Sequence, residues 1–284
     1  IQLSSNDYLG FNQHPKVIEA GQKALKKWGA SSTGSRISNG GRAYHRRLEE
    51  KLAGFLGTQD CHVHAAGYLS CMSSIQGLAS RNDVVLADRN IHSSLWSGIG
   101  ISRARVEKFS HNDPSSLLRA VELESPDRAK LLVFEGVYSM EGHIAPLPEY
   151  LEIAKEHDLF TIMDDAHGLG VIGETGRGTA EHFDCLGKVD LICGSLSKAM
   201  ASTGGYVAGD KELLEYVRTH SKQTIFSAAI SPAQAACAEA AIELIKEEPE
   251  HLIRLRQNTK HYKNGLKKIG IDTWGSQTSA VPLI

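Results

Sequence analysis

One lysine stands out because of the residues around it. Lys198 lies in the stretch GSLSKAMASTGG at 194–205, among hydroxyl-bearing and small residues and directly after the apolar run 189–193. It could be the lysine of a Ser-x-x-Lys serine acyltransferase, a solvated loop residue, or an amine that bonds covalently to an aldehyde cofactor. Serine enzymes of the first kind also carry Ser-Asp-Asn and Lys-Thr-Gly elements. The sequence contains neither, so we set that interpretation aside.

Two further motifs permit other chemistry. The string GLGVIG at 168–173 matches a dinucleotide-binding pattern, but Asp164–His167 separate it from the preceding apolar run and more glycines follow it. We therefore predict a glycine-rich loop there rather than the start of a helix. Asp164 and His167 could bind a metal together with His62 and His64, but no further ligand at a suitable spacing completes the set. We predict no metal site and interpret His62 and His64 as ordinary strand residues.

The elements that must position these residues follow a regular alternation. Apolar runs predict strands at 61–65, 84–87, 131–134, 159–163, 189–193 and 205–208. Amphipathic stretches predict helices at 15–28, 42–56, 114–122, 148–157 and 233–247. Strands that alternate with helices indicate an α/β fold with a mostly parallel central sheet flanked by helices.

Polar residues follow several of the predicted strands directly. Glu135 follows the run at 131–134, Asp164–His167 follow the run at 159–163, and Ser195–Lys198 follow the run at 189–193. Ligands of such sheets bind at the carboxyl ends of the strands. We therefore expect these side chains to meet at one edge of the sheet.

Three segments are predicted along the chain. Residues 1–30 form an N-terminal segment, and 31–245 form a large ligand-binding domain. Residues 246–284 form a linker helix and the start of a small C-terminal domain, with a first strand expected at 270–274. Because the sequence stops within an apolar run, we expect this small domain to be truncated.

Composition excludes several classes of protein. The 284 residues carry a net charge of −2, which gives no electrostatic basis for binding nucleic acid. No apolar run reaches the roughly 18–20 residues of a transmembrane helix. The five cysteines are odd in number and contain no Cys-x-x-Cys, which favours a reducing compartment, and we expect a cytoplasmic protein.

Lys198 and Asp164 together fit an aldehyde cofactor best. Pyridoxal 5′-phosphate needs a lysine for its Schiff base and an acid that keeps the pyridine nitrogen protonated, so that the ring can accept electrons. It also needs hydroxyls and main-chain N–H groups for its phosphate. Both charged residues follow predicted strands, and hydroxyls flank the lysine.

At this point the sequence resembles the α-oxoamine synthase family of fold-type I pyridoxal phosphate enzymes. The resemblance covers essentially the whole chain, and its motifs occur in family order. They include Asn6–Gly10, Gly34–Arg36, Gly67-Tyr68, His92-Ser93, Glu135–Gly142, Asp164–His167 and Ser195–Ala199. The resemblance implies a fold-type I transferase fold with a small C-terminal domain.

The resemblance also implies roles at the ring of the cofactor. Lys198 would hold it covalently and later act as the base at Cα of the substrate. Asp164 would pair with the pyridine nitrogen, Ala166 would pack on one face of the ring, and His92 would stack on the other. His167 would reach the ring hydroxyl.

Further roles are implied around the ring. Ser139 would lie beside the cofactor, Ser195 would bind the phosphate, and main-chain N–H groups of Gly67 and Tyr68 would help it. Asn6 would contact the substrate carboxylate. Ser227 matches a segment that reaches the phosphate from the partner subunit, which implies a homodimer with shared active sites.

The chemistry implied is a decarboxylative condensation of an amino acid with an acyl-CoA thioester to give an α-amino ketone. The motifs lean toward the serine palmitoyltransferase and 8-amino-7-oxononanoate synthase branches. Another fold-type I enzyme, such as an aminotransferase or an aldolase-like lyase, and a catalytically impaired family member are the alternatives.

Five positions depart from the family pattern. Cys71 replaces an Asn, His143 an Asp, Asp165 a Glu, Ala201 a Gly and Ala228 a Thr. None of these changes removes a group that the implied chemistry requires.

Overall fold

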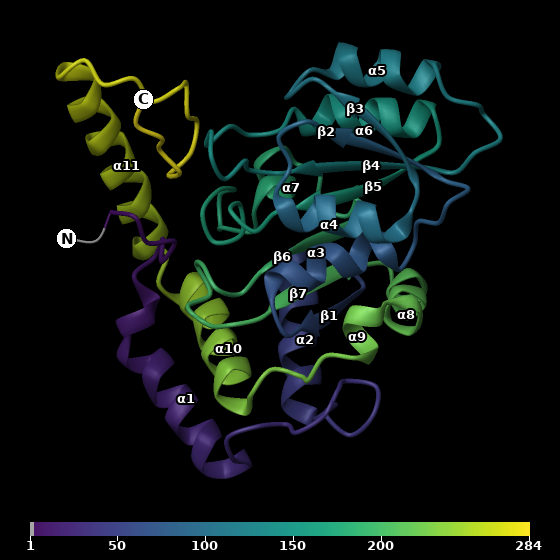
Figure 1. The fold of residues 1–284 in the computed structure, drawn as a ribbon. Coiled ribbons are helices and arrows are strands. Elements are labelled where there is room, and N and C mark those ends of the chain that lie inside the picture. The colour runs from purple at the N-terminus through teal and green to yellow at the C-terminus, as the bar shows by residue number, and fades with distance from the viewer. Residues whose placement is uncertain (1–2) are drawn as a thin grey trace.

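A computed structural model describes residues 3–284 and places a seven-stranded sheet at the centre of the fold (Figure 1). The strands are β1 (Asp60–His64), β2 (Val84–Asp88), β3 (Arg105–Phe109), β4 (Lys130–Glu135), β5 (Leu159–Asp164), β6 (Leu191–Ser195) and β7 (Gly205–Gly209). Their order across the sheet is β1-β7-β6-β5-β4-β2-β3. Only β7 runs antiparallel to its neighbours among these strands, so the predicted mostly parallel sheet is confirmed.

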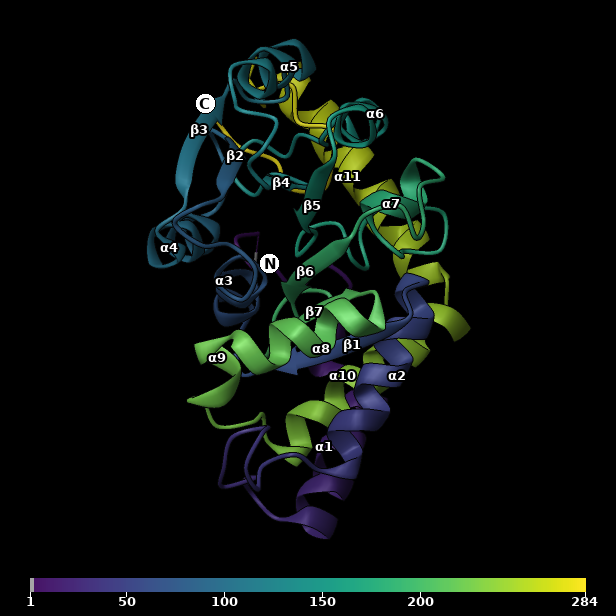
Figure 2. The same cartoon turned by 90° about the vertical axis from the view of Figure 1, so that its right-hand side faces the viewer.

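The helices cover both faces of this sheet. They are α1 (Pro15–Trp28), α2 (Ala43–Leu56), α3 (Gly67–Gln76), α4 (Ser93–Ser102), α5 (Pro114–Glu122), α6 (Leu147–Glu156), α7 (Thr179–His182), α8 (Lys211–His220), α9 (Lys222–Ile225), α10 (Pro232–Glu247) and α11 (Glu250–Lys268). Figure 2 shows α3 and α4 on one side of the sheet and α5 and α6 on the other. This is the arrangement that right-handed crossovers between parallel strands produce.

Burial explains which elements the sequence reveals. Every residue of β2 and β4 is buried, as expected for central parallel strands covered on both faces, and these strands read as continuous apolar runs. The five predicted helices are all present, with ends shifted by at most one residue. For α5, Asp113 caps the first turn through its carboxylate and Pro114 occupies the first helical position.

The predicted strand at 270–274 is wrong. The structure has turns and irregular backbone there, and Gly270, Trp274 and Gly275 all adopt positive φ. The Asp272 carboxylate accepts a hydrogen bond from the Trp274 N–H at 2.8 Å, which closes a turn. An apolar segment becomes a strand only when an adjacent strand offers hydrogen bonds, and none lies beside this segment in the described chain.

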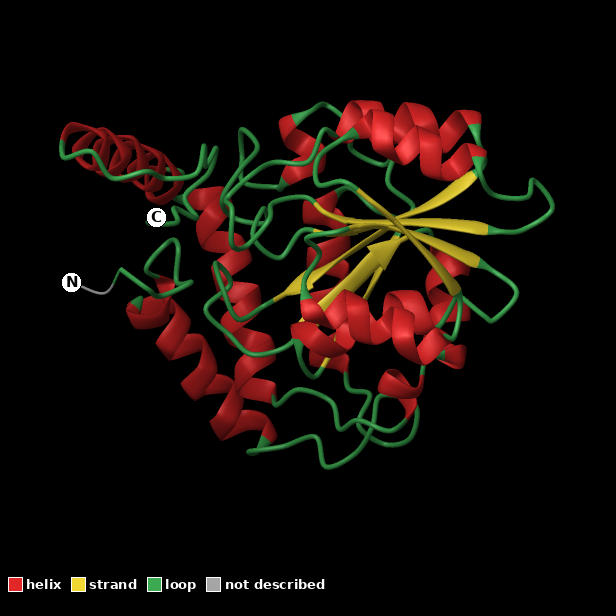
Figure 3. Cartoon of the chain, turned by 45° about the horizontal axis from the view of Figure 1, so that its top comes forward, coloured by secondary structure: helices red, strands yellow, loops and turns green. Residues whose placement is uncertain are grey.

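The last part of the chain lies at the margin of the molecule. Helix α11 stands apart from the helices that cover the sheet, and only Leu252 and Leu266 of its residues are buried (Figure 3). Residues 271–284 turn back from α11 toward the loop that follows β4. Among residues 3–284, no helix combines the length and the apolar character that a membrane span requires.

Candidate active site

The polar residues that follow the strands do meet, as the sequence predicts. They line a cavity of about 270 Å³ at the carboxyl ends of β4, β5 and β6, together with residues from the starts of α3 and α4. Eight of the predicted site residues line it: Gly67, Tyr68, His92, Ala166, Asp164, His167, Ser195 and Lys198. Pockets of this size suit a small cofactor better than a drug-sized ligand, for which ~300 Å³ is the lower end.

Lys198 extends from the connection between β6 and β7. The connection is short, and Ala201 within it adopts a positive φ of 48°. Burial lowers the pKa of the Lys198 amine, while the nearby carboxylates of Asp164 and Glu135 oppose this shift. A lysine with a lowered pKa has a larger uncharged fraction and is therefore a better nucleophile and base.

Asp164 ends β5 and is only 5% exposed. One carboxylate oxygen accepts a hydrogen bond from the Ala166 N–H at 3.0 Å, and the other accepts from the Cys71 thiol at 3.1 Å. The carboxylate is thus held in place by two donors at the wall of the cavity. It suits a partner that carries a proton on a ring nitrogen.

His167 is held by Tyr8, which comes from the N-terminal segment. The Tyr8 hydroxyl lies 2.7 Å from Nδ1 of His167. Burial lowers the pKa of His167 to about 3 and raises that of Tyr8 to about 12, so both side chains are neutral. A hydroxyl that donates to Nδ1 of this neutral ring leaves the ring proton on Nε2.

His92 is oriented by the helix that it precedes. It is the N-cap of α4, and its Nδ1 accepts a hydrogen bond from the Ser94 N–H at 3.2 Å. The same nitrogen lies 2.7 Å from the Ser94 hydroxyl. With Nδ1 as the acceptor from the Ser94 N–H, Nε2 is the ring nitrogen left to donate. Tyr68 meets the His92 ring edge-on, with centroids 6.4 Å apart.

The start of α3 provides a site for an anion. The N-cap residue, Ala66, has no side chain that could accept from the first N–H groups of the helix. Gly67 permits β6 to approach: a Cβ at this position would lie 2.6 Å from Cβ and 2.8 Å from Oγ of Ser195. The Ser195 hydroxyl is itself 2.6 Å from that of Ser197. Free N–H groups beside hydroxyls suit a phosphate.

Two buried carboxylates at this edge, those of Glu135 and Asp165, have no role among those that the family resemblance implies. Burial and the charge of Asp164 raise the pKa of Glu135, one of whose oxygens accepts from the Ser139 N–H at 3.3 Å. Burial raises the pKa of Asp165 to about 7, although it accepts hydrogen bonds from the N–H and hydroxyl of Thr179. Glu135 ends β4 and Asp165 directly follows β5, and this position at the strand ends was the signal available in the sequence.

Three other predicted site residues lie outside this cavity. Asn6 and Ser139 line an adjacent cavity of about 430 Å³, between the N-terminal residues and the segment 279–284. Ser227 lies between α9 and α10 and lines neither cavity. Within one chain, then, the structure brings Asn6 and Ser139 together but does not bring Ser227 to the lysine.

The described residues do not form a metal site that includes His62 or His64. Both histidines are buried on β1, and Nδ1 of His62 lies 3.4 Å from the Glu49 carboxylate. Within residues 3–284, neither ring belongs to a cluster of three ligand atoms close enough to bind one ion. GLGVIG at 168–173 forms turns, as predicted, with positive φ at Gly170 and Gly173.

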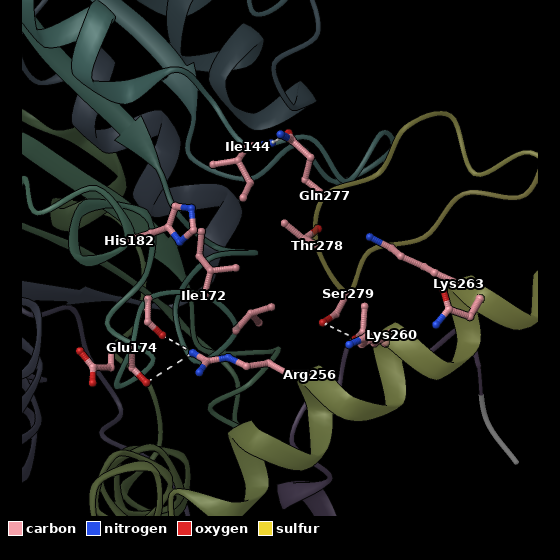
Figure 4. Close-up of a pocket in the computed structure, with 14 residues that line it drawn as sticks. Ile144, Ile172, Glu174, His182, Arg256, Lys260, Lys263, Gln277, Thr278 and Ser279 are labelled. Carbon is pink, nitrogen blue, oxygen red and sulfur yellow. Dashed lines mark hydrogen bonds between the residues drawn. The ribbon is translucent and has the colours of Figure 1, made fainter. Parts of the chain in front are cut away.

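A larger cavity of about 590 Å³ contains none of the predicted site residues. It lies between α11 and the glycine-rich loop, and Arg256, Lys260 and Lys263 of α11 face it (Figure 4). Arg256 donates to the Gly173 carbonyl and Lys263 donates to the Ser276 carbonyl at 2.7 Å. The Arg256 contact connects α11 to the glycine-rich loop, and the Lys263 contact connects it to the C-terminal segment.

The cavity at the strand ends fits pyridoxal phosphate. Lys198 offers an amine with a lowered pKa, Asp164 offers a carboxylate held by two donors, and the start of α3 beside Ser195 offers donors for a phosphate. The donor set is complete for an aldehyde with a basic ring nitrogen and a phosphate.

Comparisons with known proteins agree with this geometry. The model of the family described as aminotransferase class I and II matches residues 1–284. The chain is 40% identical to 8-amino-7-oxononanoate synthase 1 of Bacillus subtilis, over 100% of this chain and 72% of that protein. It is also 40% identical to the serine palmitoyltransferase of Sphingobacterium spiritivorum, over 100% of this chain and 71% of that protein.

A solved structure extends the comparison to the fold. Serine palmitoyltransferase from S. paucimobilis, solved with a bound PLP–myriocin aldimine, has a TM-score of 0.94 and 33% sequence identity. The match covers 99% of this chain and 73% of that chain. The predicted fold class, family and cofactor are confirmed. The chain therefore belongs to the aminotransferase class I and II family and, within it, to the pyridoxal phosphate-dependent α-oxoamine synthases.

Proposed function

We propose that the protein condenses an amino acid with an acyl-CoA thioester, with loss of carbon dioxide, to give an α-amino ketone. The observation that carries this proposal is the cavity in which an amine of lowered pKa, a fixed carboxylate and a helix N-terminus converge. The names of the relatives, serine palmitoyltransferase and 8-amino-7-oxononanoate synthase, support this class of reaction.

Each residue of the cavity has a proposed task. When bound, pyridoxal phosphate supplies an electron sink that stabilises negative charge at Cα of the amino acid. Lys198 holds the cofactor covalently, and Asp164 holds a proton on its ring nitrogen. Ser195 and the first N–H groups of α3 bind its phosphate. His92 and Ala166 pack against its ring.

Proton transfer at Cα falls to Lys198. Because burial lowers the pKa of its amine, the Lys198 side chain would be able to accept a proton from Cα when it is not bonded to the cofactor. His167 donates its Nε2–H toward the ring hydroxyl, since Nδ1 is bonded to Tyr8. Asp164 and His167 are buried in the wall of the cavity, where the lower polarity strengthens these interactions.

The substrates would enter by the adjacent cavity. Asn6 and Ser139 line it, and we propose Asn6 as a ligand of the amino acid carboxylate. We also propose a homodimer in which Ser227 reaches the phosphate in the partner subunit. The exposed position of Phe226, whose side chain is 79% exposed, supports a contact of this segment with another chain. A cytoplasmic location is proposed on the unpaired cysteines.

The first experiment is a titration with pyridoxal phosphate, followed by visible absorbance. A new band is expected in the parent protein, and Lys198→Ala should abolish it while the circular dichroism spectrum is unchanged. The matched control is Lys188→Ala, at an exposed lysine between α7 and β6. This change should leave the band intact. A band that survives in Lys198→Ala would contradict the assignment of the lysine.

Separate additions then distinguish the reaction class. Serine, alanine and glycine are each added with and without an acyl-CoA, and release of free CoA thiol is measured. Release that depends on one amino acid supports the condensation. Transfer of the amino group to a 2-oxo acid, with no need for acyl-CoA, would instead indicate an aminotransferase.

A further inference from the structure

Two histidines connect the end of β2 to the C-terminal segment through three consecutive hydrogen bonds. Nδ1 of His111 lies 3.2 Å from a carboxylate oxygen of Asp88. Nε2 of His111 lies 3.0 Å from Nδ1 of His143. Nε2 of His143 lies 2.8 Å from the main-chain oxygen of Trp274. The two ring planes are inclined to each other by only 22°.

The number of protons in this chain of contacts follows from its two ends. The Asp88 carboxylate and the Trp274 carbonyl are both acceptors, so the ring nitrogen that faces each of them must carry a proton. The contact between His111 and His143 needs a third proton, on one of the two facing nitrogens. Two neutral imidazoles carry only two protons in total. All three hydrogen bonds therefore require that the pair hold one additional proton.

Asp88 is suited to balance this charge. It is fully buried, and burial would raise its pKa. Hydrogen bonds from His111 and from the N–H groups of Asn90 and Asn112 outweigh this effect and lower the pKa of Asp88. Asp88 therefore stays ionised and favours a cationic histidine pair beside it.

The surrounding elements add few other charges. Tyr138 meets the His111 ring edge-on, with centroids 4.4 Å apart. Glu141 accepts a hydrogen bond from Asn90 on the sheet side. Beside the C-terminal segment, Lys263 is bonded to the Ser276 carbonyl and Asp272 to the Trp274 N–H. Within the described chain, Asp88 is the acid in direct contact with the pair.

The pair holds one wall of the proposed substrate cavity. The segment 274–280 docks on the loop 142–144, where Gly142 accepts from the N–H of Gln277 at 2.9 Å. The Gln277 side chain accepts from the Ile144 N–H at 2.8 Å, and both residues are visible in Figure 4. Trp274 and Ala280 then line the cavity that also contains Asn6 and Ser139.

We propose that His111 and His143 share one additional proton, and that His143 is thereby a positioning residue that fixes the segment 274–280 as a wall of the substrate cavity. Loss of the proton leaves two acceptors facing each other at one of the three contacts, which weakens the attachment of the segment. That this cavity binds the substrate rests on the proposed function. The shared proton of the two histidines and the attachment of the segment 274–280 do not depend on it.

Nitrogen-15 NMR of the cofactor-free protein tests the proton directly. Histidine chemical shifts are followed from about pH 5 to about pH 9, a range that brackets ordinary histidine titration. We expect the shifts of His111 and His143 to report three ring protons over the two rings in the lower part of this range. Two neutral rings at about pH 6, with the three contacts intact, would overturn the proposal.

Amide hydrogen exchange tests the attachment. The reporters are the amides of Gln277 and Thr278, which both bond to the Gly142 carbonyl, with protection factors corrected for intrinsic exchange. Their protection should fall by about two- to tenfold as the shared proton is lost, because either the contact between the two rings or the contact of His143 with the Trp274 carbonyl then loses its hydrogen bond. Protection that is constant across the range would contradict the role of the proton.

Two variants separate the proton from the attachment. His143→Asp can accept from His111, so His111 should keep both protons, but it cannot donate to Trp274, so the two amides should lose protection. In His143→Gln nothing at 143 titrates, and the protection should no longer vary with pH. His157→Gln, at a partly buried histidine without a side-chain hydrogen bond in the described chain, is the matched control. Parent-like pH dependence in both variants at position 143 would refute the role of His143.

Discussion

Replacing Gly67 by Ala tests whether the start of α3 binds the phosphate. A Cβ at this position would lie 2.6 Å from Cβ of Ser195, whereas ordinary contact begins at 3.4 Å. The helix and β6 must therefore separate, which moves the first N–H groups of the helix away from the Ser195 hydroxyl. Loss of one charged hydrogen bond costs about 1.5–3 kcal/mol, or about a 10- to 150-fold weaker Kd.

The assay is a titration of the Gly67→Ala protein with pyridoxal phosphate and, separately, with pyridoxal, which has no phosphate. The Kd for pyridoxal phosphate should rise by this factor, and the Kd for pyridoxal should change much less. The extra methyl group should also lower the free energy of unfolding by about 1–3 kcal/mol, as overpacking does. Urea denaturation measures that cost independently of the cofactor.

Gly54→Ala is the matched control. Gly54 lies within α2, and a Cβ there would contact nothing within 4 Å. This change should stabilise the helix by about 0.5–1 kcal/mol and leave both Kd values unchanged. If Gly67→Ala binds pyridoxal phosphate as the parent does, or loses affinity for both ligands equally, the assignment of the phosphate site fails.

Three other substitutions have defined outcomes. Tyr8→Phe removes the donor to Nδ1 of buried His167, so it should lower the free energy of unfolding by about 1–3 kcal/mol, as measured by urea denaturation. It should also shift the His167 ring toward its other tautomer, as measured by nitrogen-15 NMR. Asp165 has a folded-state pKa of about 7, above its unfolded value of ~3.9, so its contribution to stability is present below pH ~4 and is lost as pH rises toward 7. The stability of Asp165→Asn relative to the parent should therefore increase over that range. Burial would raise the pKa of Glu49, but hydrogen bonds from its basic neighbours, including Arg36, lower it, so its contribution is present above the unfolded pKa and is lost as pH falls. Glu49→Gln should destabilise the protein by about 3–5 kcal/mol at neutral pH and less in acid.

Each of these outcomes can be contradicted. An unchanged tautomer in Tyr8→Phe would show that the phenol does not set it. A stability difference for Asp165→Asn that does not vary with pH would mean that the carboxyl group titrates normally. If Glu49→Gln costs less than about 1 kcal/mol at neutral pH, the pair with Arg36 is not desolvated in solution.

Among the strands, the sequence predicted those that are largely buried and missed the one whose burial is mixed. Continuous apolar runs disclosed β2 and β4, which are covered on both faces. Strand β3 (Arg105–Phe109) lies at the edge of the sheet and mixes charged with apolar residues, so no apolar run marked it. The strand expected at 270–274 had the right composition, but a strand also needs a neighbour, which composition does not report. The division at residues 30 and 245 stays a prediction.

The candidate site was predictable as far as strand ends define it. Residues that directly follow β4, β5 and β6 were brought together as expected, because parallel strands end at one edge. Contacts between distant segments were not predictable. The hydrogen bond from Tyr8 to His167 and the thiol contact from Cys71 to Asp164 depend on how helices and loops pack, and single residues give no signal of such partners.

The pairing of β1 with β7 has a consequence for biosynthesis. Asp60 pairs with Gly209, and α1 packs on α10, so segments that are far apart in the chain complete each other. During translation, β1 is therefore synthesised long before its partner strand β7. Until β7 is made, the edge of β1 has no strand to pair with. Such non-local pairing slows folding and exposes aggregation-prone intermediates. The yield of native protein should thus depend on the synthesis of β7, and nascent chains that stop before residue 205 should need chaperones to stay in solution.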